Sequence, residues 1–340
     1  MSRSDSSSAR RALVTVALFG LWLSGCSSPA APTPTPPPPP PVEVVADPPT
    51  ITCPTTVQAS TILTSGTAVT FEPTTEKGKD PVSIQCSPAS GTNFPIGDTS
   101  VECRVTDALN RSAACSLIVQ VKKLPTLSKT RFLAFGDSIT AGEVTFPVGS
   151  TALGVPSFKL VQVPSAAYPT VLAKQLQANY KAQEDLITVA NYGVGGEKAA
   201  DARNRFITAL SIVRPEAVLI LQGANDIPLG EDAAASTAAN EVRIMAAEAK
   251  GRGMRVFIAT LPPARAGGSR AIKQLLLDDY NNRIRDLAFR ENAVLVDIYQ
   301  YLLSNVTLYI GVDGLHPTEA GYAKMAEAFF FAIRQNLEVP

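Results

Sequence analysis

From about residue 131 onward, this 340-residue chain repeats one pattern, a short apolar segment followed by a longer segment with helical periodicity. The repetition predicts a doubly wound α/β domain, because parallel strands need crossover connections that are usually helical. The expected strands are residues 131–135, 187–191, 217–221, 256–260 and 293–298, and the expected helices are 168–180, 199–213, 234–251, 271–290 and 317–336.

Four polar clusters follow these strands or lie in the loop before the last helix. Ligands of such sheets bind at the carboxyl ends of the strands, so we expect the clusters to meet at that edge. The clusters are Gly136-Asp137-Ser138-Ile139-Thr140, Asn191-Tyr192-Gly193-Val194-Gly195-Gly196, Gly223-Ala224-Asn225-Asp226 and Asp313-Gly314-Leu315-His316-Pro317.

Two of these clusters contain the residues of a nucleophilic mechanism. A serine hydroxyl needs a base within about 3 Å to take its proton, and histidine suits the task because its unperturbed pKa is about 6.5. His316 is the only histidine of the chain, so a serine–histidine mechanism must use it. Asp313 is close enough in sequence to hold Nδ1 of the ring while Nε2 faces Ser138.

With these clusters the sequence resembles the SGNH, or GDSL, hydrolases over residues 131 to about 337. The resemblance implies a flavodoxin-like parallel sheet and a serine esterase that acts through an acyl-enzyme, with no metal or organic cofactor. The matching positions are the nucleophile, Ser138; the acid and base, Asp313 and His316; and the oxyanion donors, which are the backbone N–H groups of Ser138 and Gly196 and the amide of Asn225.

Three other acidic residues of the clusters and their surroundings are given non-catalytic roles. Asp137 and Asp226 are expected to anchor their turns, and Glu197 to be a surface or helix-start charge. The segment 141–167 is expected to be a long loop that walls the substrate pocket, because it begins beside Ser138.

The apolar residues of segment 141–167 favour a substrate with an acyl chain. We therefore expect lipid, aryl or short-chain acyl esters as substrates, hydrolysed at the cell surface. An acetylated glycan, and so a carbohydrate acetyl esterase, is the alternative. A third reading is a surface adhesion lipoprotein that uses the hydrolase fold as a platform. The 30 basic and 30 acidic residues form no long run of one sign, so nothing indicates a nucleic-acid partner.

The first 48 residues predict export and a spacer. Arginines precede an apolar stretch of about 12 residues, roughly 18 Å of helix and too short for a ~30 Å hydrocarbon core, which is typical of a signal peptide. Residues 23–26, Leu-Ser-Gly-Cys, resemble the lipobox of bacterial lipoproteins. The resemblance implies a lipoprotein signal peptide over residues 1–25, lipidation of Cys26 and a proline-rich linker over 26–48. We expect an exported protein, lipid-anchored to a bacterial membrane and facing the periplasm or the cell exterior; a soluble periplasmic protein is the alternative.

Residues 49–123 show short alternating stretches without helical periodicity, which predicts a small β-sandwich. Strands are expected at 68–71, 82–86, 100–105 and 116–121. An even number of cysteines in an exported chain favours two disulfides, and the lack of CxxC pairs argues against a metal site. The four cysteines are Cys53, Cys86, Cys103 and Cys115.

The motifs around these cysteines resemble the hyalin repeat, an immunoglobulin-like extracellular module, with one departure at Leu109-Asn110 where the family usually has Gly-Asn. Three disulfide connectivities are possible, and we take Cys53–Cys115 with Cys86–Cys103, which would tie the outer and the middle strands. The partner of the module is unknown, and a plain spacer is the default interpretation. A connector, residues 124–130, leads to the hydrolase-like domain, residues 131–340.

Overall fold

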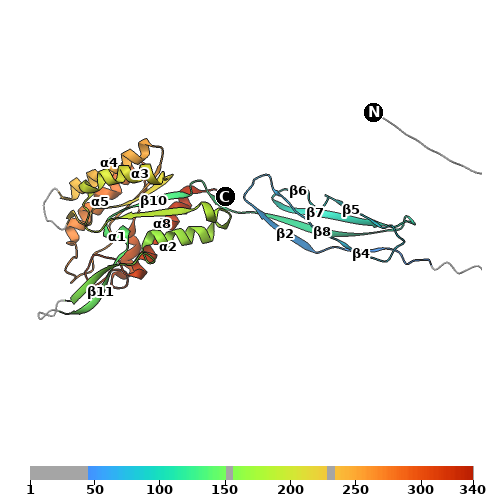
Figure 1. Ribbon diagram of the computed structural model, residues 1–340, viewed down its shortest axis with the longest axis horizontal. Coiled ribbons are helices and arrows are strands. Elements are labelled where there is room, and N and C mark those ends of the chain that lie inside the picture. Colours follow the sequence, from blue (N-terminus) through green and yellow to red (C-terminus); the bar gives the residue numbers. More distant parts are fainter. Residues whose placement is uncertain (1–44, 151–155, 228–233, 340) are drawn as a thin grey trace, which may run out of the picture. The chain divides into compact units, whose positions relative to one another are not determined.

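The computed structural model describes residues 45–150, 156–227 and 234–339 (Figure 1). The expected signal peptide, Cys26 and most of the proline-rich linker lie outside the described residues. Within the described part, no helix has both the length and the apolar character needed to cross a membrane.

The second half of the chain contains the predicted parallel sheet. Neighbouring strands pair in parallel throughout. When the five strands are numbered along the chain, their spatial order is 2-1-3-4-5. This is the flavodoxin-like arrangement, so the predicted fold class is confirmed. In spatial order the strands are β13 (Thr188–Gly193), β10 (Arg131–Gly136), β14 (Ala217–Leu221), β15 (Arg255–Ala259) and β16 (Val294–Val296).

Helices cover both faces of this sheet (Figure 1). The pair α2 (Tyr168–Asn179) and α8 (Glu319–Leu337) packs on one face, where the rings of Tyr168 and Phe329 stack at 4.7 Å. The opposite face carries α3 (Ala199–Val213), α4 (Ala234–Gly251) and α5 (Gln274–Arg290). Because β14 is covered on both sides, all of its residues are buried and apolar.

The segment expected to be a loop contains an antiparallel hairpin, β11 (Glu143–Ser150) and β12 (Pro156–Gln162), so that expectation was wrong. Its alternation of Val144, Phe146 and Val148 suits a strand, but Gly and Pro residues hide the pattern. The shorter elements are α1 (Ser138–Ala141), η1 (Lys181–Leu186), α6 (Ile298–Leu302), η3 (Leu303–Asn305), α7 (Val306–Tyr309) and the paired β9 (Thr126–Leu127) and β17 (Glu338–Val339).

The cysteine-containing segment is built from strands, as predicted. A four-stranded sheet has the order β2-β8-β7-β5, in which β2 runs parallel to β8 and the other pairs are antiparallel. Phe94, Val101 and Val119 are fully buried in its core. The strands are β1 (Thr50–Thr52), β2 (Thr56–Thr61), β3 (Thr67–Ala68), β4 (Thr74–Glu76), β5 (Ser83–Ser87), β6 (Asn93–Phe94), β7 (Gly97–Thr106) and β8 (Ser112–Lys123).

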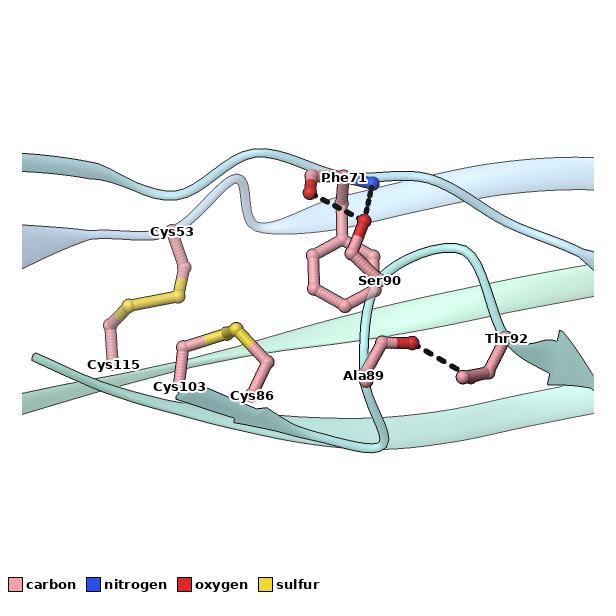
Figure 2. Close-up of a disulfide and its surroundings, with 8 residues drawn as sticks. All are labelled: Cys53, Phe71, Cys86, Ala89, Ser90, Thr92, Cys103 and Cys115. Carbon is pink, nitrogen blue, oxygen red and sulfur yellow. Dashed lines mark hydrogen bonds between the residues drawn. A yellow bond between two sulfur atoms is a disulfide. The ribbon is translucent and has the colours of Figure 1, made fainter. Parts of the chain in front are cut away.

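Two disulfides lie beside this core (Figure 2). Cys86–Cys103 joins paired positions of β5 and β7, and Cys53–Cys115 joins the segment after β1 to β8. Next to them Ser90 Oγ donates to the carbonyl of Phe71 at 2.8 Å and accepts from its N–H at 2.9 Å. The two disulfides therefore tie β5 and the segment after β1 to the central strands β7 and β8 of a module whose core is small.

Candidate active site

Ser138 begins helix α1 immediately after β10. Oδ1 of Asp137, the N-cap residue, accepts a hydrogen bond from the N–H of Ile139 at 3.0 Å. Gly142 ends the helix in the left-handed conformation, with φ of 88°, and its N–H donates to the carbonyl of Ser138. This capped turn holds Ser138, which is buried, at the carboxyl edge of the sheet.

The structure brings Ser138, His316 and Asp313 into one hydrogen-bonded chain. His316 Nε2 lies 2.8 Å from Ser138 Oγ, and His316 Nδ1 lies 2.5 Å from Asp313 Oδ2. Serine and histidine are 178 residues apart in sequence, so only the fold joins them. The three side chains have the mutual geometry that a serine-hydrolase triad requires.

Asp313 is held in its charged form. Burial by itself would raise the pKa of this carboxyl, but hydrogen bonds from the His316 ring and from the backbone N–H groups of Leu315 and His316 outweigh it and lower the pKa below its usual range. A carboxylate acceptor at Nδ1 favours the tautomer of the ring that leaves Nε2 facing Ser138.

The loop that carries the acid and the base is fixed by its backbone. Gly311 N–H donates to the carbonyl of His316 at 2.8 Å, and Arg270 N–H donates to the carbonyl of Asp313 at 2.7 Å. Thr318 then caps α8 by accepting from the N–H of Gly321 at 3.1 Å. The orientation of His316 is therefore set before any substrate binds.

Gly196 and Asn225, the expected oxyanion donors, belong to loops that are joined by Glu197. The carbonyl of Glu197 accepts from Asn225 Nδ2 at 3.1 Å and from Gln222 Nε2 at 3.2 Å. Gly196 has a left-handed φ of 76°, which glycine adopts without strain. One proton of the Asn225 amide is thus used for anchoring, and the second has no hydrogen-bond acceptor among the described residues.

Arg205, on α3, ties this loop to the end of β10. Its guanidinium donates to the carbonyls of Tyr192 at 2.7 Å and Gly136 at 3.2 Å. The same group forms an ion pair with the carboxylate of Glu197 and lies 4.1 Å from the centre of the Phe135 ring. Sequence reasoning missed Arg205, because its position in a helical segment carries no motif.

The aspartates beside Ser138 and Asn225 anchor neighbouring loops. Asp137 Oδ2 accepts from the N–H of Ala224 at 3.3 Å, which connects the Ser138 turn to the Asn225 loop. Burial raises the pKa of Asp137 to about 7, although hydrogen bonds from Ile139 and Ala224 and the charge of His316 oppose the rise. Asp226 accepts from the N–H of Ala199 at 3.1 Å, the first residue of α3.

Glu197 was expected to be a surface or helix-start charge, and it does lie directly before Lys198, the N-cap residue of α3. It is not a surface charge, since its side chain is only 12% exposed and pairs with Arg205. The carboxylate became buried because α3 packs its arginine against the loop that precedes it. The residue is an internal support of the candidate oxyanion site.

Glu143 is a second residue that sequence reasoning missed. Its Oε2 lies 3.8 Å from His316 Nε2, the nitrogen that faces Ser138. A Cβ placed on Gly195 would come within 2.2 Å of Oε1, so the carboxylate packs against the loop that carries Gly196. Glu143 opens β11, the strand that was expected to be loop, so nothing in its sequence position indicated this contact.

A small cavity of about 240 Å³ adjoins Asn225 and the histidine loop. Its lining residues are Ala224, Asn225, Ser269, Arg270 and Leu315. The apolar residues Phe146 and Val148 of the β11–β12 hairpin are instead 43% and 62% exposed. The lining of the cavity is partly polar, since it includes Asn225, Ser269 and Arg270.

Comparison with known proteins agrees with this architecture. The sequence profile of the GDSL-like lipase/acylhydrolase family matches residues 134–324, and that of the HYR domain matches residues 45–121. A lipase/acylhydrolase structure from Enterococcus faecalis is 22% identical and has a TM-score of 0.50, with 61% of this chain and 97% of the other covered.

The structure of Axe2, an acetylxylan esterase from Geobacillus stearothermophilus, is 23% identical, with a TM-score of 0.46 and coverage of 61% and 94%. No curated protein matches the chain.

Proposed function

The chain belongs to the GDSL-like lipase/acylhydrolase family, and from this we propose that it is a serine esterase with the triad Ser138–His316–Asp313. One observation carries the assignment of residues: the unbroken hydrogen-bonded chain from Ser138 Oγ through the imidazole to Asp313. All three side chains are buried, which protects their hydrogen bonds from competing water.

In the proposed mechanism, Ser138 Oγ attacks the ester carbonyl while His316 Nε2 takes its proton. The negative charge on the carbonyl oxygen is stabilised by the N–H groups of Ser138 and Gly196 and by the free amide proton of Asn225. His316 then protonates the leaving alcohol. A water molecule, deprotonated by His316, hydrolyses the acyl-enzyme and regenerates Ser138.

The size of the cavity favours a short acyl group. Pockets for drug-sized ligands usually occupy about 300–1,000 Å³, whereas the cavity beside Asn225 has about 240 Å³ and contains Ser269 and Arg270. We infer that acetyl to butyryl esters are preferred over long lipid acyl chains. A carbohydrate acetyl ester is the second candidate, since the polar lining suits a hydrated substrate.

An activity panel tests this function. p-Nitrophenyl esters of increasing acyl length and acetylated xylan are compared for the natural chain, Ser138→Ala and His316→Ala. Each variant should lose on the order of 10⁴-fold or more in kcat. Ser304→Ala, an exposed serine of η3, serves as a matched control and should keep full activity.

Natural-level turnover by Ser138→Ala would refute the triad. Inactivity of the natural chain across the panel would favour the platform reading, in which the module with the disulfides mediates adhesion.

The cell-surface location is a separate proposal. It rests on the signal-peptide pattern and the lipobox resemblance around Cys26, together with two disulfides, which persist in oxidising compartments. Metabolic labelling of cells with a palmitate analogue should mark the protein, and Cys26→Ala should abolish the label. A labelled Cys26→Ala variant would contradict the anchor.

A further inference from the structure

Glu143 places a carboxylate where the alcohol part of an ester must leave. Its Oε2 is 3.8 Å from His316 Nε2, the atom that donates the proton to the leaving oxygen in the proposed mechanism. That oxygen must come within about 3 Å of Nε2, so it lies within about 7 Å of the carboxylate. Any charge on the alcohol close to the ester bond is therefore near this negative group.

The backbone of Glu143 is anchored, and its side chain packs against a neighbouring loop. The carbonyl of Glu143 accepts a hydrogen bond from the hydroxyl of Tyr322, a buried residue of α8, at 2.7 Å. Oε1 packs against the backbone of Gly195, and the side chain is 21% exposed. The carboxylate therefore stands on an anchored backbone, with part of its surface open to a substrate.

The carboxylate is also not neutralised by a cation of the described residues, among which only His316 lies within ion-pair distance. Arg205 is committed to Glu197, and Arg270 lines the cavity beside Asn225. The leaving-group side of the site is consequently negative, while the cavity side carries a positive charge.

Resting on the esterase function above, we propose that Glu143 is a specificity-determining residue that selects the alcohol by charge. Esters of cationic alcohols are favoured, those of neutral alcohols are accepted, and those of anionic alcohols, such as phosphate- or carboxylate-bearing ones, are disfavoured. Two unit charges about 7–10 Å apart at an effective dielectric constant near 20 change a rate by about 15- to 50-fold. Because Glu143 is partly exposed and screened by solvent, we expect an effect below this range, about tenfold for each step of charge.

The test uses three acetate esters of similar size: the cationic choline ester, its neutral analogue 3,3-dimethylbutyl acetate, and the anionic 2-sulfoethyl acetate. Values of kcat/KM are measured at low salt for the full chain and for Glu143→Gln. The neutral ester is the internal reference, so any general effect of the substitution cancels in the ratios. The cation-to-anion ratio should fall from about 100-fold to less than about fivefold in Glu143→Gln.

Glu248→Gln is the matched control, because it removes the same charge elsewhere. Glu248 pairs with Arg252 near the end of α4, the helix that leads into β15, and so lies at the opposite edge of the sheet. Its ratio should equal that of the natural chain. If Glu143→Gln also leaves the ratio unchanged while neutral-ester hydrolysis still depends on Ser138, this inference is overturned and the esterase function stands. If no ester is hydrolysed by the natural chain, the esterase function fails and takes the inference with it.

Discussion

Replacing Arg205 with methionine tests whether the candidate oxyanion site depends on the contacts of Arg205 with Gly136, Tyr192 and Glu197. The substitution keeps a long apolar stem but removes the donors to Gly136 and Tyr192 and the partner of Glu197. Glu197 would then be free to move, and its carbonyl orients the Asn225 amide. The expected defect is a misplaced oxyanion donor.

The expected losses of stability and of kcat follow from the exposure of the Arg205–Glu197 ion pair and from the contribution of one oxyanion donor to the rate. Breaking a buried ion pair costs about 3–5 kcal/mol. Because Arg205 and Glu197 are 26% and 12% exposed, we expect a loss of about 2 kcal/mol in the free energy of unfolding. Removing an oxyanion donor costs about 3–4 kcal/mol of transition-state stabilisation. Displacing the donor should cost roughly half of that, or about 20-fold in kcat, with little change in KM.

Arg203→Met is the control. Arg203 lies on the same helix and forms an ion pair with Glu241, in which the arginine is more exposed than Arg205, and its described contacts do not include the candidate site. This variant should lose stability to a similar extent and change kcat by less than about threefold.

A double-mutant cycle completes the assay. Asn225→Ala alone should lose about 10²- to 10³-fold in kcat. If Arg205 acts through Asn225, adding Arg205→Met to that background should cost only a few-fold more. Full additivity of the two losses, or equal losses of kcat in Arg205→Met and Arg203→Met, would refute the reasoning.

Three further perturbations test the described structure. The pKa of Asp137 is raised from 3.8 to about 7, so between about pH 4 and 7 only the unfolded chain releases this proton and stability falls as pH rises. Asp137→Asn should remove that part of the slope in urea unfolding curves measured across this range; an unchanged slope would contradict the assignment. Gly193→Ala should prevent folding, because its Cβ would lie 2.0 Å from the backbone of α1. Gly196→Ala has open space around its Cβ, so it should lower the free energy of unfolding by only about 1–2 kcal/mol, the cost of the left-handed backbone conformation. Thermal melts of both variants would separate these cases, and equal Tm values would count against the packing described. Replacing Cys53 and Cys115 by alanine should lower the stability of the β module by about 2–4 kcal/mol without changing kcat on a soluble ester.

The sequence by itself determined the order and type of the main elements. Three predicted elements match the structure to the residue: the helices at 199–213 and 234–251 and the strand at 217–221. Their apolar residues recur with the period of a helix or a strand, and this pattern can be found from the local sequence alone. The sequence also indicated which clusters meet, since the carboxyl ends of parallel strands share one edge. Ser138, Asp313 and His316 could therefore be selected before any coordinates.

Only the tertiary structure decided which residues hold the candidate site in place and which charged groups lie beside it. The contacts of Arg205 with Gly136 and of Glu143 with His316 join positions that are far apart in the chain. They depend on how α3 and the β11 hairpin pack, which local propensity does not specify. The choice among three disulfide connectivities has the same origin, because strand register and not cysteine spacing places Cys86 opposite Cys103. Local sequence patterns encode helices and strands, but the electric field and the hydrogen bonds of the candidate site arise only when side chains distant in sequence are packed together.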